Sequence, residues 1–260
     1  MRATKTKTLP LEFLKLLAHD IRWRILLALS RSDHRVEELV KQIKQPHNLI
    51  SYHLKRLRLQ QLVSERRSSA DARDIYYSLN LDRFRQMYSE TGQALHPAAS
   101  EPIATPQPQT NTVSESPIRV LFLCTHNSAR SQMAEGLLRE LGHNKVEVFS
   151  AGTEPAGIHP LAIKVMSGRG IDLRTQRSKH LEEYLGQEFD YVITVCDRVR
   201  EVCPVFPGEP DHIHWSFPDP TAIEGNRKTQ ESGFEDTARQ LTVRIQYLLL
   251  MIDRRRKEKK

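Results

Sequence analysis

Cysteine is scarce in this sequence, with three residues among 260. So few thiols exclude a small secreted domain held together by disulfide bonds. No apolar run reaches the ~20 residues that cross a bilayer, and the N-terminal residues contain no apolar core of a signal peptide. We therefore expect a cytoplasmic protein with no membrane association, whose thiols stay reduced unless they take part in chemistry.

Aromatic residues are absent from residues 96–117, which instead hold five prolines and many small or polar residues. Such a segment buries too little apolar surface to offset the entropy of ordering it. It predicts a proline-rich linker between a first domain at 1–95 and a second domain at 118–260, which ends in a basic tail.

Charge differs between the two predicted domains. Residues 1–95 contain 18 Lys and Arg against 10 Asp and Glu, whereas residues 118–260 contain 21 against 20. An excess of one sign in one part of a chain suggests that this part meets a polyanion. The first domain is therefore the candidate for binding a nucleic acid.

The first domain shows three helical segments followed by a ribbon. Residues 11–29, 36–43 and 48–62 carry apolar residues at helical spacing, and strand-like runs follow at 62–66 and 74–79. This order is typical of a winged helix-turn-helix, mainly α-helical with a β-wing, whose second helix of the pair enters the major groove of DNA. The outward side chains of the third segment and the basic ribbon supply the predicted DNA contacts: His47, Asn48, Ser51, Tyr52, Lys55, Arg67 and Arg73. The alternative is a helical interaction domain with an ordinary solvated surface.

Two segments of this domain, residues 17–26 and 50–57, are similar to the arsenical-resistance repressor (ArsR) family of winged-helix regulators. The resemblance implies a homodimer, formed through this domain, on a palindromic operator in double-stranded DNA. Metal-sensing members carry paired cysteines before the recognition helix, but residues 33–40 and the rest of this domain contain none. A soft thiolate site for trivalent arsenic is thereby excluded from this domain, and we expect no metal site, its histidines being structural or DNA-facing.

The second domain opens with an apolar run at 118–124, which is typical of a strand buried on both faces. Cys124 ends this run, a helical pattern follows at 133–141, and Arg130 stands six positions after the cysteine. A loop that leads into a helix N-terminus points backbone N–H groups at an anion, and a guanidinium clamps a tetrahedral oxyanion. The predicted oxyanion cradle consists of Thr125, His126, Asn127, Ser128, Ala129 and Arg130.

The positive field of such a cradle predicts that Cys124 is a thiolate at neutral pH. Asn127 is a residue type that tolerates left-handed backbone in the loop, and the hydroxyl of Ser131 is placed to donate to the thiolate. A buried inert cysteine beside a surface arginine is the alternative reading of this motif.

Further strand-like runs at 145–149, 190–195 and 212–215 alternate with helical patterns, the last of them at 234–254. This alternation predicts an α/β domain with a four-stranded parallel sheet, whose ligand lies at the carboxyl ends of the strands. Asp219, held between two prolines after the last strand, is a candidate general acid. An ordinary Asp-Pro turn is the alternative.

Cys196 and Cys203 lie seven positions apart, directly after the run at 190–195. A helix would separate them by about 10 Å, whereas a disulfide needs Cα atoms within about 7 Å, so they pair only if the segment unwinds. Two unrelated core cysteines are the alternative. The presence of all three cysteines in one domain favours a redox relay.

Several stretches of the second domain resemble the thioredoxin-coupled arsenate reductases of the low-molecular-weight protein tyrosine phosphatase superfamily: residues 124–135, 150–153, 192–204 and 217–220. The resemblance implies that Cys124 attacks arsenate while Arg130 holds the oxyanion and Asp219 aids loss of hydroxide. Cys196 then attacks Cys124 and expels arsenite, and Cys203 resolves that disulfide to give Cys196–Cys203. No cofactor is bound, and thioredoxin or another dithiol system is the external reductant.

Potassium-binding members of that family carry an aspartate where this chain has Lys179. A lysine ammonium at this position would replace the cation among Asn127, Glu135 and Ser150. We therefore expect no dependence on potassium.

The sequence favours an arsenate reductase fused to a DNA-binding regulator of arsenic resistance, and two other functions stay open. A low-molecular-weight tyrosine phosphatase needs only Cys124, Arg130 and Asp219, but usually has an aromatic residue after the Asp-Pro pair, where this chain has Thr221. The second is a transcriptional regulator whose C-terminal domain only senses an oxyanion or arsenite.

Overall fold

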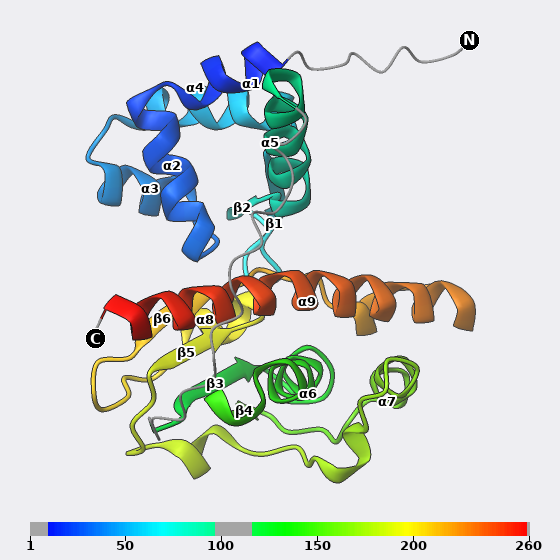
Figure 1. Ribbon diagram of the computed structural model, residues 1–260. Coiled ribbons are helices and arrows are strands. Elements are labelled where there is room, and N and C mark those ends of the chain that lie inside the picture. The colour runs from blue at the N-terminus through cyan, green and yellow to red at the C-terminus, as the bar shows by residue number, and fades with distance from the viewer. Residues whose placement is uncertain (1–9, 97–115, 259–260) are drawn as a thin grey trace. The chain divides into compact units, whose positions relative to one another are not determined.

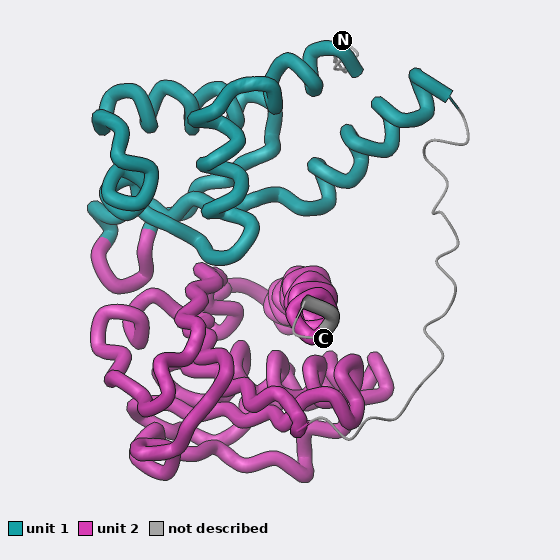
Figure 2. The backbone as a smooth tube through the Cα atoms, turned by 60° about the vertical axis from the view of Figure 1, so that its left-hand side comes forward, with its two compact units in different colours: residues 1–67, 72–114 teal, residues 68–71, 115–260 magenta. Residues whose placement is uncertain are grey.

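The computed structural model describes residues 10–96 and 116–258. The chain forms two compact units, residues 1–67 with 72–114 and residues 68–71 with 115–260 (Figure 2). The predicted linker at 96–117 lies almost entirely outside the described residues. None of the helices within the described ranges is long and apolar enough to cross a membrane.

The first unit is a winged helix-turn-helix, as predicted from the sequence (Figure 1). Its strands pair antiparallel and form the wing. Apolar side chains of the helices, among them Ile25, Leu54 and Leu57, form its core. Its elements in chain order are α1 (Pro10–Leu17), α2 (Asp20–Arg31), α3 (Val36–Ile43), α4 (His47–Leu59), β1 (Val63–Arg67), β2 (Ile75–Leu79) and α5 (Leu81–Leu95).

Two local expectations for this unit were wrong. The predicted helical segment at 11–29 is broken between α1 and α2, because His19 has an extended backbone with φ −151° and ψ 123°. After the break the two helices bury different faces, so Leu14, one of the apolar residues at helical spacing in the predicted segment, is 44% exposed. Helix α5 was not predicted, because few of its side chains are apolar and only Met87 and Thr91 are buried.

The second unit is an α/β domain with a four-stranded parallel sheet in the order β4-β3-β5-β6. This agrees with the fold class predicted from the sequence. Its strands are β3 (Ile118–Cys124), β4 (Val146–Gly152), β5 (Tyr191–Thr194) and β6 (Asp211–His214), and its α-helices are α6 (Arg130–Gly142), α7 (Pro160–Ser167), α8 (Asp197–Glu201) and α9 (Arg227–Glu258). Short 3₁₀ helices span His143–Lys145, Leu173–Thr175, Leu181–Tyr184 and Pro220–Ala222.

The long helix α9 covers α6 and α7, and α6 in turn packs on β3 and β4 (Figure 1). Helix α9 binds there because its buried side chains recur every three or four residues and so form one apolar stripe: Phe234, Ala238, Leu241, Ile245, Leu248 and Ile252. The loops that follow β3 and β5 begin at the carboxyl edge of the sheet.

Candidate active site

Cys124 and Cys196 lie at the carboxyl ends of two neighbouring strands. Strands β3 and β5 are parallel neighbours in which Leu123 pairs with Thr194, and the amide of Val195 donates to the carbonyl of Leu123 at 2.8 Å. Cys124 and Cys196 therefore emerge at the same edge of the sheet. The chain passes from β3 to β4 on one side and to β5 on the other, and ligands of α/β sheets bind in such a crevice.

The loop after Cys124 is folded around its sulfur. Asn127 adopts a left-handed backbone with φ 44°, as its residue type predicted, and its amide N–H donates to Cys124 Sγ at 3.1 Å. The segment after β4 braces this loop, because the amides of Glu154 and His159 donate to the carbonyls of Thr125 and Ser128. The predicted cradle is thus a real backbone turn that opens into the N-terminus of α6.

Gly152 is required for this bracing and was not predicted to have a role. A Cβ at this position would lie 2.4 Å from the carbonyl oxygen of Thr125 and 2.8 Å from the amide nitrogen of Asn127. Any side chain would therefore push the cradle away from β4. Only a pattern of close backbone approach, which a single sequence does not display, would have identified it.

Arg130 joins the cradle to the predicted acid. Its buried guanidinium donates from Nη2 to Asp219 Oδ2 at 2.8 Å and from Nη1 to the carbonyl of Phe217 at 3.1 Å. Burial alone would raise the pKa of Asp219, but Arg130 and hydrogen bonds from Thr221 outweigh it and hold that pKa below its usual range. Without substrate, Asp219 is therefore an ionised partner of Arg130, and its carboxyl group carries no proton to donate.

The expected thiolate at Cys124 is contradicted in the protein alone. Burial raises the pKa of Cys124, and the neighbouring Cys196 thiol raises it further. Arg130, the Ser131 hydroxyl and the Asn127 amide lower it without outweighing burial. Sequence reasoning counted the donors of the cradle and omitted the cost of desolvating a charged sulfur.

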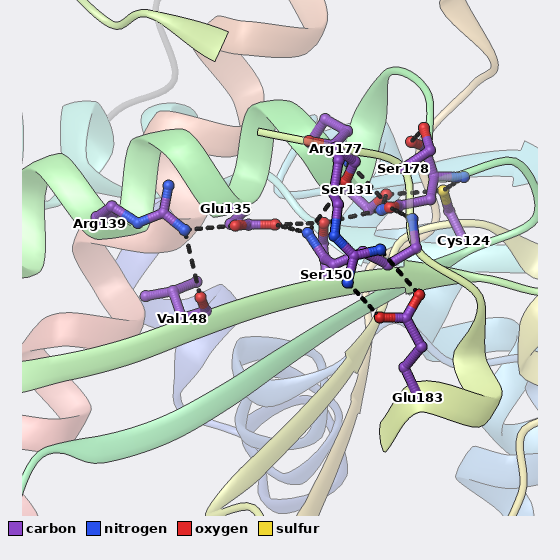
Figure 3. A network of polar contacts seen from close by, with 12 residues as sticks. Cys124, Ser131, Glu135, Arg139, Val148, Ser150, Arg177, Ser178 and Glu183 are labelled. Atoms are coloured by element: carbon purple, nitrogen blue, oxygen red, sulfur yellow. Dashed lines mark hydrogen bonds and ion pairs between the residues drawn. The ribbon is translucent and has the colours of Figure 1, made fainter. Parts of the chain in front are cut away.

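A chain of buried hydrogen bonds runs from Cys124 to a lysine (Figure 3). The Asn127 amide group donates to the hydroxyls of Ser131 at 2.9 Å and Ser150 at 2.8 Å. Ser131 Oγ, which lies 2.9 Å from Cys124 Sγ, therefore has its own proton available for the sulfur, as predicted. Ser150 likewise donates to Glu135.

Lys179 ends this chain in the way that the sequence predicted. Its buried ammonium lies 3.1 Å from Glu135 Oε2 and donates to the carbonyl of Arg177 at 3.1 Å. Its own amide donates to Asn127 Oδ1 at 2.8 Å. A fixed positive charge thus orients Glu135, Ser150 and Asn127 toward the cysteine.

Two further side chains hold Asn127 and were not predicted. Gln132 Nε2 donates to Asn127 Oδ1 at 2.9 Å, and the hydroxyl of Ser178 donates to the Asn127 carbonyl at 2.7 Å. Gln132 is fully buried. Gln132 lies in the first turn of α6. Only knowledge that its amide is buried could have pointed to it, because buried polar groups need partners.

The remaining two cysteines flank α8, whose five residues keep them unpaired. Cys196 is buried and lies 3.4 Å from the hydroxyl of Thr125, so it contacts the cradle. Cys203 is partly buried, and burial raises the pKa of its thiol to about 11. The arrangement places a second thiol beside Cys124 and a third at a distance from it.

The predicted DNA-binding side chains lie where periodicity placed them. Those of α4 form one exposed or half-exposed face at positions i, i+1, i+4, i+5 and i+8: His47, Asn48, Ser51, Tyr52 and Lys55. Arg67 and Arg73 are exposed at the wing, where Arg67 also donates to the carbonyl of Ala72 at 2.9 Å. Among the described residues, no group of three or more His, Cys, Asp or Glu is arranged to hold a metal ion.

Comparisons with known proteins separate the two units in the same way. Residues 119–258 match the family described as Low molecular weight phosphotyrosine protein phosphatase. Residues 19–65 match the family described as Bacterial regulatory protein, arsR family.

Individual proteins are also similar to this chain. Proteins named arsenate reductase from Halalkalibacterium halodurans and Shouchella clausii are 38% and 37% identical over 126 residues, which is 48% of this chain and 91% of each relative. A solved thioredoxin-dependent arsenate reductase of Corynebacterium glutamicum is 24% identical, with a TM-score of 0.43 over 84% of this chain and 94% of that one.

Proposed function

Because this chain belongs to the low molecular weight phosphotyrosine protein phosphatase family and carries an arsR-family domain in front of it, we propose that it reduces arsenate to arsenite and binds operator DNA. One observation carries the enzymatic part: a second buried thiol, Cys196, contacts the cradle of Cys124. A phosphatase has no use for that thiol. The names of the relatives support the same activity.

The first step is attack of Cys124 on the arsenic atom. Arsenate accepts hydrogen bonds from the N–H groups of the cradle and from the guanidinium of Arg130. That guanidinium then interacts with two anions, the substrate and Asp219. Since Arg130 is the main cause of the low pKa of Asp219, this sharing raises that pKa and lets the carboxyl hold a proton. An S–As bond forms, an As–O bond breaks, and Asp219 protonates the departing hydroxide to water.

The second step reduces the arsenic. The thiolate of Cys196 attacks Cys124 Sγ, an S–S bond forms, and the electron pair of the S–As bond stays on arsenic, which leaves as arsenite. Cys203 then attacks Cys196, which releases Cys124 as a thiolate and leaves a Cys196–Cys203 disulfide. Thioredoxin, or another dithiol, reduces that disulfide by exchange.

The assay that tests this function follows arsenite release from arsenate with thioredoxin, thioredoxin reductase and NADPH, beside hydrolysis of p-nitrophenyl phosphate by the same protein. We expect turnover of arsenate, none with Cys124→Ser, and a single arsenite per chain with Cys203→Ser. Cycling of Cys203→Ser at the parent rate would contradict the relay. Fast phosphate hydrolysis without arsenite release would make the second unit a phosphatase.

The regulatory part of the proposal is a homodimer of the first unit on a palindromic operator. Apolar side chains remain exposed on α1 and α5, which contact each other, and they provide a surface for a second copy: Leu11, Leu14, Tyr88 and Leu95. The exposed faces of α4 and the wing supply the DNA contacts.

A further inference from the structure

The segment that carries Cys196 and Cys203 must change shape in the proposed relay. The five residues of α8 and Val202 separate the two thiols, and at a rise of about 1.5 Å per residue an intact helix holds them too far apart for a disulfide. One end of α8 therefore moves toward the other when Cys203 attacks Cys196. The contacts at the two ends of the helix differ, and they indicate which end stays in place.

The N-terminal end is anchored by a buried carboxylate. Asp197, the first residue of α8, is fully buried. Its Oδ1 accepts hydrogen bonds from Ser216 Oγ at 2.8 Å and from His214 Nε2 at 3.2 Å. Burying a carboxylate costs free energy unless such donors compensate it, and neither arsenate binding nor the attack of Cys124 uses this one.

Asp197 Oδ2 also accepts from the backbone amide and the hydroxyl of Ser69, whereas the Oδ1 partners His214 and Ser216 lie at the carboxyl edge of the sheet. His214 ends β6, and its Nδ1 lies 2.8 Å from Thr194 Oγ1, at the end of β5. Both are buried. The side chain of Asp197 thus fixes the start of α8 to the carboxyl ends of the two strands beside it, one residue after Cys196.

The chain just after α8, at its Cys203 end, is more exposed than Asp197. Cys203 Sγ has a contact of 3.7 Å with the carbonyl of Pro204. Val202 and Val205, on either side of it, are 63% and 93% exposed. This end can therefore leave its place at little cost in packing.

We propose that Asp197 is a positioning residue for the relay, a role that rests on the proposed function of the second unit. Through His214 and Ser216 it holds Cys196 beside Cys124 while the Cys203 end of α8 unwinds and approaches. Without this anchor, Cys196 would no longer be held beside the cradle, and the Cys124–Cys196 disulfide would form slowly. Oxyanion binding by the cradle does not depend on it.

The test uses the full chain with Cys203→Ser, in which the relay stops at the Cys124–Cys196 disulfide. Protein is mixed with arsenate and quenched with acid, and its remaining thiols are alkylated and counted by mass spectrometry. In this background Asp197→Ala should form the disulfide at least tenfold more slowly. Asp197→Asn, which keeps an acceptor oxygen for Ser216, should recover part of the rate. The control Asp172→Asn, an exposed aspartate that caps a 3₁₀ helix, should match the parent.

A second measurement separates positioning from a general loss of structure. Phosphate affinity, measured by protection of Cys124 from iodoacetamide, should stay within twofold in every variant. If Asp197→Ala does not fold, Ser216→Ala, which removes the hydrogen bond from Ser216 Oγ to Asp197, should slow formation of the disulfide about threefold. A folded Asp197→Ala protein that forms the disulfide at the parent rate, or that loses phosphate affinity in the same proportion, would overturn the role. A parent that forms no arsenate-dependent disulfide would instead overturn the proposed function, and this role with it.

Discussion

Lys179 places a buried positive charge at the end of the hydrogen-bond chain that leads to Cys124. Its ammonium lies within hydrogen-bond distance of Glu135 and of a backbone carbonyl, and the chain of hydrogen bonds from Glu135 through Ser150 and Asn127 ends at Cys124. A buried charge of this kind polarises the whole chain, because each hydrogen bond strengthens the next in a low dielectric. That this ammonium takes the place of a potassium ion stays a prediction, which the family resemblance implied.

Arsenate reduction should therefore proceed at equal rates in potassium and sodium salts of the same ionic strength. Lys179→Met should slow it about tenfold, which corresponds to about 1.4 kcal/mol of barrier. The same change should lower the free energy of unfolding by about 1–3 kcal/mol, because a buried carboxylate loses a charged donor. Urea denaturation measures that loss.

The matched control is Lys145→Met, which removes an exposed pair with Asp253 and should cost at most about 1 kcal/mol. Clear stimulation of the unaltered protein by potassium would contradict the assignment of Lys179 as the resident cation.

Asp219 should make the free energy of unfolding depend on pH. Burial opposes its ionisation, but Arg130 and the Thr221 hydrogen bonds hold its pKa below the unfolded value, which is about 3.9. A carboxyl with a depressed folded pKa stabilises the fold above the unfolded pKa and loses this contribution as the pH falls through the folded pKa. The difference in urea midpoint between the parent and Asp219→Asn should thus be constant from about pH 7 to 5. It should disappear as the pH falls below about 4. A difference in urea midpoint that grows on acidification would show that the pair with Arg130 is not the stabilising contact.

At the scale of an element, we expect α4 and the wing to make different kinds of contact with DNA. The exposed face of α4 carries short polar and aromatic groups that suit base edges, whereas the wing carries guanidinium groups that suit phosphates. His53 lies on the opposite, buried face of α4, where its ring packs 4.3 Å from that of His19. Only the outward face of this helix is thus available to DNA.

Substitutions on these two elements should have different effects on binding by the full chain. Asn48→Ala or Tyr52→Ala should reduce the preference for the operator over random duplex by about 1–3 kcal/mol. Arg67→Ala should weaken binding to all duplexes alike and reduce the salt slope by about 1. Titrations at several salt concentrations measure both quantities, with the exposed Arg31→Ala on α2 as a control. Equal loss of preference in the Arg67→Ala and Asn48→Ala proteins would contradict this division.

At the scale of the whole molecule, the thiols and the DNA-binding helix belong to different units. All three cysteines lie in the second unit, so arsenite has no thiolate ligand in the first. Any effect of arsenite on DNA binding must therefore begin at Cys124, Cys196 or Cys203 and pass between the units.

Operator affinity of the full chain should accordingly be insensitive to arsenite once the three cysteines are replaced by serine. The measurement compares operator binding with and without arsenite in the parent and in the triple variant. A parent that releases DNA would place the signal in the reductase thiols, because they are the soft ligands of this chain. Release of DNA by arsenite from the cysteine-free protein would contradict this origin of the signal.

The sequence by itself determined the features that depend on local order. The division into a basic and a catalytic domain follows from composition, and the outward face of α4 follows from helical periodicity. Cys124, Asn127 and Arg130 could be placed because a strand, a turn and a helix N-terminus follow one another along the chain.

Only the tertiary structure decided the features that depend on burial and on contacts between distant segments. The raised pKa of Cys124 arises from desolvation, which no motif reports. The break between α1 and α2 arises because packing selects which apolar residues turn inward. The anchor of Asp197 joins side chains that are 17 and 19 positions apart, and they meet because parallel strands bring their carboxyl ends to one edge of the sheet.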